Sequence, residues 1–147
     1  MGTPRPTPAE LEILRVLWDR GPSLVRDVQE VLNADRTTGY TTVLKLLQIM
    51  TDKGLVARDE NARAHVYSAR LPQSQTQRQL VRDLVDRAFA GSAASLVMQA
   101  LSARRTSSAE IVMIRRLLDD LEGRDRPHRV EVEPLKRLTM RCQESAR

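Results

Sequence analysis

The sequence has very little of the residue type on which disulfides and thiolate metal sites depend. One cysteine, Cys142, stands among 147 residues, so the chain can form no internal disulfide and no site held by several thiolates. No apolar run approaches the roughly 20 residues that a membrane-spanning helix needs. The opening MGTPRPTPAE lacks the hydrophobic segment typical of a signal peptide. We therefore expect a cytoplasmic protein without membrane insertion.

Histidine is almost as scarce, which argues against an enzyme or a metal site. The two histidines are His65, in a predicted hairpin, and His128, in a segment rich in proline and arginine. Neither is accompanied by a nucleophile or a base in a recognisable catalytic motif. A single thiol with one histidine cannot form a selective zinc or copper site. The sequence thus predicts no catalytic residue, no metal and no cofactor.

Positive charge is in excess, but it is unevenly distributed along the chain. The formal net charge of +5 and the isoelectric point near 10.1 suggest an acidic partner such as nucleic acid. Four Arg stand against six Asp or Glu in residues 1–35, and six Lys or Arg against three acids in residues 36–72. In residues 123–147 seven Lys or Arg stand against four acids. More than half of the excess therefore lies in this last segment, and the overall charge alone says little about binding.

Capping signals predict two helices in the first 35 residues. Thr7-Pro8-Ala9-Glu10 is a capping box with proline at the first helical position, so a helix is expected from Pro8 to the Gly21-Pro22 pair. Ser23 is expected to cap a second helix, followed by a polar turn over residues 33–38. Each helix carries an apolar stripe, made of Leu11, Leu14, Leu17 and Trp18 in the first and Val25, Val28, Val31 and Leu32 in the second.

A third helix, predicted within TTGYTTVLKLLQIMTDKGLV, has two faces of different character. Gly54 is expected to end it in the left-handed conformation. At about 100° per residue, its core face holds Val43, Leu46, Leu47 and Met50, and its polar face holds Thr41, Lys45, Gln48 and Asp52. Hydroxyl, amide and ammonium groups can reach base edges or phosphates. For this helix alone, an ordinary solvated surface is the alternative interpretation.

The pattern after this helix changes to that of a β-hairpin. LVARD and AHVYSAR are two short segments with β-favouring residues, joined by the polar turn ENAR. Three helices followed by a hairpin are the layout of a winged helix-turn-helix domain, in which the last helix enters the DNA major groove. The wing would carry Arg58, Arg63 and His65, with Arg63 placed to meet a phosphate. This context favours DNA binding, with the candidate contacts Tyr40, Thr41, Thr42, Lys45, Gln48 and Arg63.

The second half of the chain predicts a helical region that needs a partner. Helices are expected over residues 75–90, over residues 93–101 with Ser92 as cap, and after the capping box Ser107-Ser108-Ala109-Glu110. Three helices in about 50 residues cannot bury their apolar stripes within one chain, because small domains remove too little surface from water. A second subunit would supply that surface, and folding back on the winged domain is the alternative. The candidate dimerisation residues are Leu84, Ile111, Ile114, Leu118 and Leu121, the last four in a coiled-coil seam.

Several of these segments resemble the penicillinase repressor family of bacterial transcription regulators, the BlaI, MecI and CopY group. The similarity covers roughly residues 7–122. It is strongest in E-x-x-I-L-x-x-L-W near the start and in Y-T-T-V-x-x-x-L-x-x-M-x-x-K-G-L-V across the third helix. The resemblance implies a homodimeric repressor that binds an inverted-repeat DNA operator through its winged domain.

The resemblance also bears on how such a repressor is relieved. Penicillinase repressors are cleaved at an Asn-Phe bond in the dimerisation region, through a pathway that starts at a membrane-bound metalloprotease sensor. The matching stretch here, SLVMQAL, has Gln99 and Ala100 at that position, so the place is present but the residue types differ. The copper-sensing branch carries several C-terminal cysteines, whereas this chain has Cys142 alone. Direct metal sensing is therefore not expected.

The sequence thus predicts a mainly α fold with a small β-hairpin. Residues 1–72 form the winged helix domain, residues 73–122 a helical dimerisation domain, and residues 123–147 a C-terminal extension whose prolines and charges are typical of a flexible segment. A helical protein-interaction adaptor that does not bind DNA is the second function class. It would use the same apolar seam without needing Lys45 or Arg63.

Overall fold

The computed structural model describes residues 4–61 and 63–125. The chain divides into two compact units, Met1–Ala93 and Ala94–Arg147. The expectations for Cys142, His128 and the C-terminal extension lie outside the described residues, apart from the end of the last helix. The predicted domain boundaries at residues 72 and 122 stay predictions.

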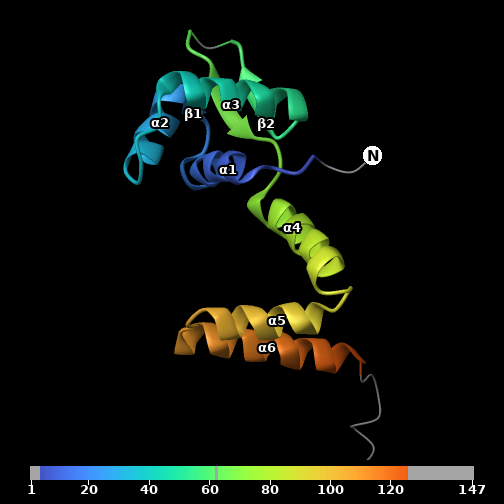
Figure 1. The fold of residues 1–147 in the computed structure, drawn as a ribbon. Coiled ribbons are helices and arrows are strands. Elements are labelled where there is room, and N and C mark those ends of the chain that lie inside the picture. The colour runs from blue at the N-terminus through green and yellow to red at the C-terminus, as the bar shows by residue number, and fades with distance from the viewer. Residues whose placement is uncertain (1–3, 62, 126–147) are drawn as a thin grey trace, which may run out of the picture. The chain divides into compact units, whose positions relative to one another are not determined.

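The first unit is a winged helix-turn-helix followed by one more helix (Figure 1). A three-stranded antiparallel sheet with the strand order β1-β3-β2 joins the wing to the helices. The predicted fold class, mainly α with a small β-hairpin, is confirmed. The elements are α1 (Pro8–Arg20), β1 (Ser23–Leu24), α2 (Val25–Asn33), α3 (Tyr40–Lys53), β2 (Val56–Asp59), β3 (Val66–Ala69) and α4 (Gln73–Ala88).

The helix ends follow the capping chemistry of the sequence, with one exception. The hydroxyl of Thr7 accepts from the N–H of Glu10 at 3.3 Å, and the Glu10 carboxylate accepts from the N–H of Thr7 at 3.0 Å, so the capping box of α1 is present. Gly54 ends α3 with φ of 79°. The expectation that Ser23 caps α2 is wrong: Ser23 lies in β1, opposite Tyr67, and Leu24 occupies the capping position.

The core of the first unit is formed where the three helices meet the sheet. Tyr67 of β3 is 1% exposed and is the largest of its fully buried side chains. Trp18 and Leu46, expected in the core, are partly buried at its edge. The buried apolar residues are Ile13, Leu14, Val16, Leu17, Val25, Val28, Val43, Leu47, Met50, Leu55, Val56 and Tyr67.

A buried ion pair holds the start of α1 to the end of α3. Glu10 is 2% exposed, and its carboxylate contacts Lys53 Nζ at 2.8 Å. Removing Lys53 would leave the buried carboxylate with the N–H of Thr7 as a hydrogen-bond donor but without a neutralising charge, which is unfavourable. The end of α3 is thereby held to α1 as well as to the wing.

The second unit contains α5 (Ala93–Ala103) and α6 (Ser108–Asp125). The Ser107 capping box is confirmed, because the N–H of Ser107 donates to Glu110 at 2.8 Å and the N–H of Glu110 donates to Ser107 Oγ at 3.2 Å. None of the side chains described in α5 or α6 is buried. Among residues 4–61 and 63–125, no helix has the length and apolar character to span a membrane.

Candidate nucleic-acid interface

The candidate DNA-contacting face of the first unit is the polar side of α3. Thr41, Lys45 and Gln48 are exposed, as predicted. On the opposite side Val43, Leu47 and Met50 are each 0% exposed, so their burial fixes the rotation of the helix about its axis. The polar side chains are therefore held outward by the same packing that stabilises the domain.

The N-terminal end of α3 offers backbone donors without a competing side chain. Gly39 is the capping residue, its φ is −74°, and it makes no side-chain capping hydrogen bond. The first turn contains no acidic residue. The unsatisfied N–H groups and the helix dipole make such an end favourable for a phosphate. Tyr40, at the first helical position, is 50% exposed and its phenolic hydroxyl can add to such a contact.

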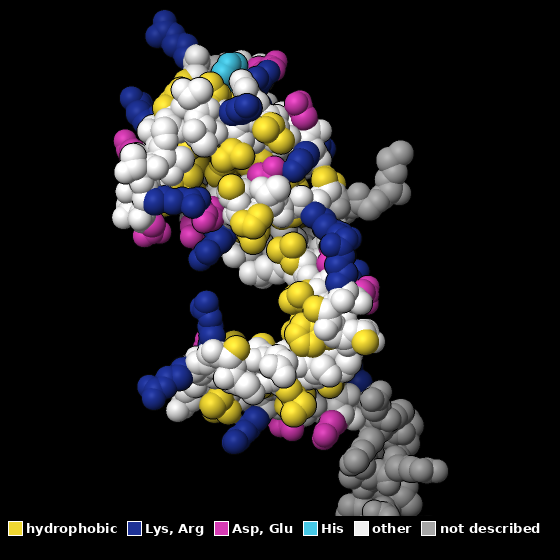
Figure 2. All heavy atoms as spheres, in the orientation of Figure 1, with side chains coloured by type: hydrophobic (Ala, Val, Ile, Leu, Met, Phe, Trp, Pro, Cys, Tyr) yellow, Lys and Arg dark blue, Asp and Glu magenta, His cyan; other side chains and the backbone are white. Residues whose placement is uncertain are grey.

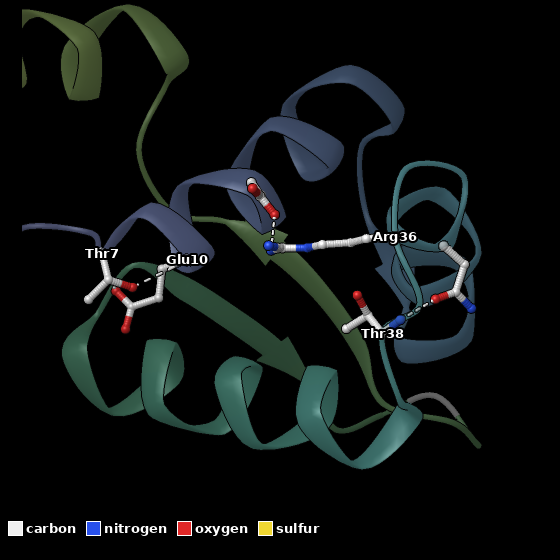
Figure 3. A network of polar contacts seen from close by, with 6 residues as sticks. Thr7, Glu10, Arg36 and Thr38 are labelled. Atoms are coloured by element: carbon white, nitrogen blue, oxygen red, sulfur yellow. Dashed lines mark hydrogen bonds and ion pairs between the residues drawn. The ribbon is translucent and has the colours of Figure 1, made fainter.

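The turn before α3 is held by side chains of α2. Asn33 Oδ1 accepts from the N–H of Thr38 at 2.7 Å, and Gln29 Nε2 donates to the carbonyl of Thr38 at 3.1 Å. On the other side of the turn, Arg36 pairs with Glu12 of α1 at 2.6 Å; Figure 3 labels both Arg36 and Thr38. The start of α3 is thus positioned by contacts with α2 on one side and with α1 on the other.

A groove of about 530 Å³ runs between α3, the wing and the start of α2. Tyr40 and Gln48 line it from α3, and Arg58 lines it from β2. Arg26, at the start of α2, also lines it, although nothing in the sequence had singled out this residue. The complete lining is Leu24, Val25, Arg26, Tyr40, Leu44, Gln48, Arg58, Ala64, His65 and Tyr67.

The other four candidates are exposed but do not line this groove: Thr41, Thr42, Lys45 and Arg63. Thr42 lines a separate hollow of about 310 Å³ with Thr38 and Gly39. Arg63 lies in the turn of the hairpin between β2 and β3. The structure therefore groups Tyr40 and Gln48 with the wing, and places Thr42 on the side toward α1.

Arg58 is paired within the wing. Its guanidinium forms an ion pair with Glu60, and hydrogen bonds to Glu60 and Tyr67 raise the pKa of the guanidinium. The same contact lowers the pKa of the Glu60 carboxyl. On the face of this unit that Figure 2 shows, Lys and Arg side chains are interspersed with Asp and Glu. Residues 1–72 have ten Lys or Arg against nine Asp or Glu, so electrostatic attraction alone is a weak source of DNA affinity for one such domain.

The candidate dimerisation residues leave apolar surface uncovered in a single chain. Leu84 of α4 is 49% exposed, and Leu118 and Leu121 of α6 are 53% and 47% exposed. Ile111 is 39% exposed, and Ile114 is the half-buried member of the set. Gln99 and Ala100, the candidate cleavage position, are exposed within the helix α5.

Comparison with known proteins adds the following relationships. A family model described as "Penicillinase repressor" matches residues 6–120. The "Transcriptional regulator BlaI" of Mycobacterium tuberculosis is 42% identical over 60 residues, which are 40% of this chain and 44% of that protein. The chain thus spans less than half the length of that relative. The "Penicillinase repressor" of Bacillus licheniformis is 23% identical over 121 residues, which are 82% of this chain and 94% of that protein.

The chain is also similar to a solved structure of a repressor bound to DNA. It is the solution structure of the monomeric form of Bacillus licheniformis BlaI in complex with the blaP half-operator. The TM-score is 0.44 and the sequence identity 25%, over 50% of this chain and 89% of that chain.

Proposed function

The chain belongs to the penicillinase repressor family, and on this premise we propose that it is a sequence-specific DNA-binding transcriptional repressor. One observation carries the proposal: α3 holds Thr41, Lys45 and Gln48 outward beside a wing. Such a helix fits the width of the DNA major groove. Glutamine can pair with adenine, lysine with guanine or a phosphate, and threonine with several bases. The uncapped start of α3 and the exposed Tyr40 provide contacts to the phosphate backbone.

The test replaces Lys45 with Ala and compares DNA affinity with that of the parent. The probe is a duplex that the wild-type protein enriches from a random pool. Because Lys45 points away from the core, the variant should keep its fold and bind the duplex about tenfold more weakly, which corresponds to the loss of one base or phosphate contact. Equal affinity of variant and parent at matched salt would contradict the assignment of this face.

Arg15→Ala is the matched control for charge. Arg15 is an exposed cation of α1, whereas Lys45 lies on the exposed polar face of α3. Its removal lowers the net charge by the same amount as Lys45→Ala, and it should leave the affinity nearly unchanged. A wild-type protein that binds no duplex at all would leave the alternative, a helical interaction adaptor.

Homodimer formation on an inverted-repeat operator is the second part of the proposal. It is supported by the apolar residues of α5 and α6, which one chain leaves exposed. A second copy can cover them, because a coiled-coil seam is self-complementary. Two linked reading heads bind two half-sites at once, and tethering raises affinity without any new contact. This compensates for the weak electrostatic attraction of a single head.

Relief of repression by cleavage at Gln99-Ala100 is the third part. A membrane-bound metalloprotease sensor pathway is the proposed source of the signal. Proteases bind extended segments, so α5 would have to unwind locally before the bond is cut. No described side chain of α5 is buried within a single chain, so the packing energy lost on unwinding would be that of the contacts with the second subunit. Mass spectrometry of the chain recovered from cells before and after derepression tests this, and an intact mass in both samples would contradict it.

A further inference from the structure

Arg58 occupies a position in the wing that the function proposed above does not use. Its side chain lines the groove that Tyr40 and Gln48 of the reading helix also line. Arg58 is directly opposite Tyr67 in the β2–β3 register, and Tyr67 is buried. Opposite residues on neighbouring strands project to the same face of a sheet. The stem of Arg58 is therefore held beside a fixed aromatic ring, and its guanidinium is presented at the wall of the groove.

The charged partner of Arg58 lies outside this groove. Glu60 pairs with the guanidinium, although Glu60 is not among the residues that line the groove. The side chain of Arg58 is 34% exposed and that of Glu60 is 68% exposed. Glu60 directly follows β2 and is two positions from Arg58, so the two long side chains are close enough in the chain to pair. No carboxylate is among the lining residues, whereas the cations Arg26 and Arg58 are.

We propose that Arg58 binds a phosphate of duplex DNA, and that Glu60 occupies its guanidinium in the free protein as an internal substitute for that phosphate. The proposal rests on the DNA-binding function proposed above and names a further contact residue for it. Association with DNA exchanges the carboxylate of Glu60 for a backbone phosphate. Glu60 thus lowers the affinity of the protein for every DNA duplex.

The exchange is favourable for two physical reasons. An exposed ion pair is weak, and Glu60 becomes hydrated when released, so no buried charge is left behind. A phosphate bound by arginine accepts charge-assisted hydrogen bonds and releases condensed counterions from the DNA. Glu60 lowers the DNA affinity because the Arg58–Glu60 pair must separate first and because the freed carboxylate remains near the phosphates.

The experiment compares Glu60→Gln with Asp59→Asn in the full chain. Asp59 is exposed at the end of β2, next to Glu60 in the sequence, and its carboxylate accepts from the N–H of Asn61 at 2.9 Å. This control therefore removes one negative charge that is not bound to Arg58. The probes are the enriched duplex and a duplex of random sequence. We expect Glu60→Gln to bind both probes about two- to fivefold more tightly than Asp59→Asn does, the range that an exposed ion pair contributes.

A second arm removes the guanidinium. Arg58→Gln should bind both duplexes more weakly and lower the dependence of log affinity on log salt by about 0.9, the value for one phosphate contact. Arg58→Lys should retain that salt dependence. In the Arg58→Gln background, Glu60→Gln should gain no more affinity than Asp59→Asn. That loss of coupling distinguishes a specific pair from a general effect of negative charge.

The result that overturns the proposal is a Glu60→Gln affinity no higher than that of Asp59→Asn. An unchanged salt dependence in folded Arg58→Gln would also overturn it. If Arg58→Gln does not fold by circular dichroism, the comparison of Glu60→Gln with Asp59→Asn decides alone. A wild-type protein that binds neither probe refutes the proposed function itself. If Lys45→Ala weakens DNA binding but Glu60→Gln does not strengthen it, only the role of Glu60 is refuted.

Discussion

At the scale of single residues, Arg63 is expected to contribute to DNA affinity but not to sequence specificity. Arg63 is exposed in the turn of the wing, away from the groove beside α3. A phosphate contact there carries no sequence information. Arg63→Ala should therefore weaken binding to the enriched duplex and the random duplex equally, and reduce the salt dependence by about one. Titration of both duplexes at several salt concentrations measures this, and a loss confined to the enriched duplex would count against it.

Glu110 gives the second unit a dependence on pH. The backbone N–H and the hydroxyl of Ser107 donate to its carboxylate, and these hydrogen bonds lower the pKa of Glu110. Because the pKa is lower in the folded than in the unfolded chain, the stabilisation is fully present above the ordinary glutamate value of about 4.3. It is lost as the pH falls through the lower folded value.

The variant Glu110→Gln isolates this effect, because glutamine keeps the shape but has no charge. At neutral pH the wild type should melt at a higher temperature than the variant, at the same protein concentration. The difference should vanish at acid pH, where Glu110 is protonated in both states. Thermal unfolding followed by circular dichroism across that range measures it. A difference that stays constant down to acid pH would exclude the charge of Glu110 as its cause.

At the scale of elements, the two ends of α3 use glycine for different reasons. Gly54 has φ of 79°, and its N–H donates to the carbonyl of Thr51 at 3.1 Å. An alanine there would be strained by its backbone conformation although its Cβ would meet only Arg70 at 3.5 Å. Gly54→Ala should therefore lower the free energy of unfolding by about 1–2 kcal/mol. Gly39, with φ of −74°, is the matched control.

Urea denaturation of both variants measures the contrast. Gly39→Ala should cost less than Gly54→Ala: alanine is a poorer capping residue than glycine, but the backbone of Gly39 suits any residue and the nearest atom, Thr42 Oγ1, is 3.9 Å from the new Cβ. Equal losses in the two variants would show that the left-handed conformation is not the cause.

The parts of the fold that depend on near neighbours could be predicted from the sequence. The capping boxes of α1 and α6 and the two faces of α3 involve residues at most four positions apart. Strand β1 could not be predicted in this way, because Ser23 and Leu24 form a strand only by pairing with β3, far along the chain. The sequence therefore assigned Ser23 to a helix cap, the commonest local use of serine at such a place.

The same distinction applies to the candidate site. Thr41, Lys45 and Gln48 are exposed on one face, as the helical period predicted. The grouping of Arg26 with Tyr40 and the wing required the tertiary packing of α2 against α3. The pairing of Arg58 with Glu60 had a local signal, since an arginine and a glutamate stand two positions apart where the predicted strand passes into the turn.

At the scale of the whole molecule, the exposed seam of α6 predicts how DNA affinity depends on assembly. Leu118→Asp would place a carboxylate in an apolar interface, at a free-energy cost on the order of several kcal/mol unless the group is protonated. The subunits should separate, and each should keep its secondary structure. Affinity for an inverted-repeat duplex should fall sharply, because the two half-sites are no longer bound as one unit.

Leu117→Asp is the matched control for this change. Leu117 is 58% exposed, similar to Leu118, but it lies outside the 111-114-118-121 seam. Sedimentation and DNA titration on the same preparations compare the two variants. A Leu118→Asp protein that stays dimeric would exclude the seam, and a monomer that binds the full operator with parental affinity would exclude the tethering argument.

The hydrogen bond of Trp18 has an optical consequence. Trp18 is the only tryptophan in the sequence. Its indole N–H donates to the carbonyl of Leu71 at 3.0 Å, directly before α4 begins. Indole fluorescence therefore comes from one place, the junction between α1 and the segment that leads out of the wing. Its emission shifts to longer wavelength when this junction opens to water, while circular dichroism follows every helix at once. The unlabelled protein thus carries a built-in reporter for whether DNA binding or subunit assembly loosens that junction.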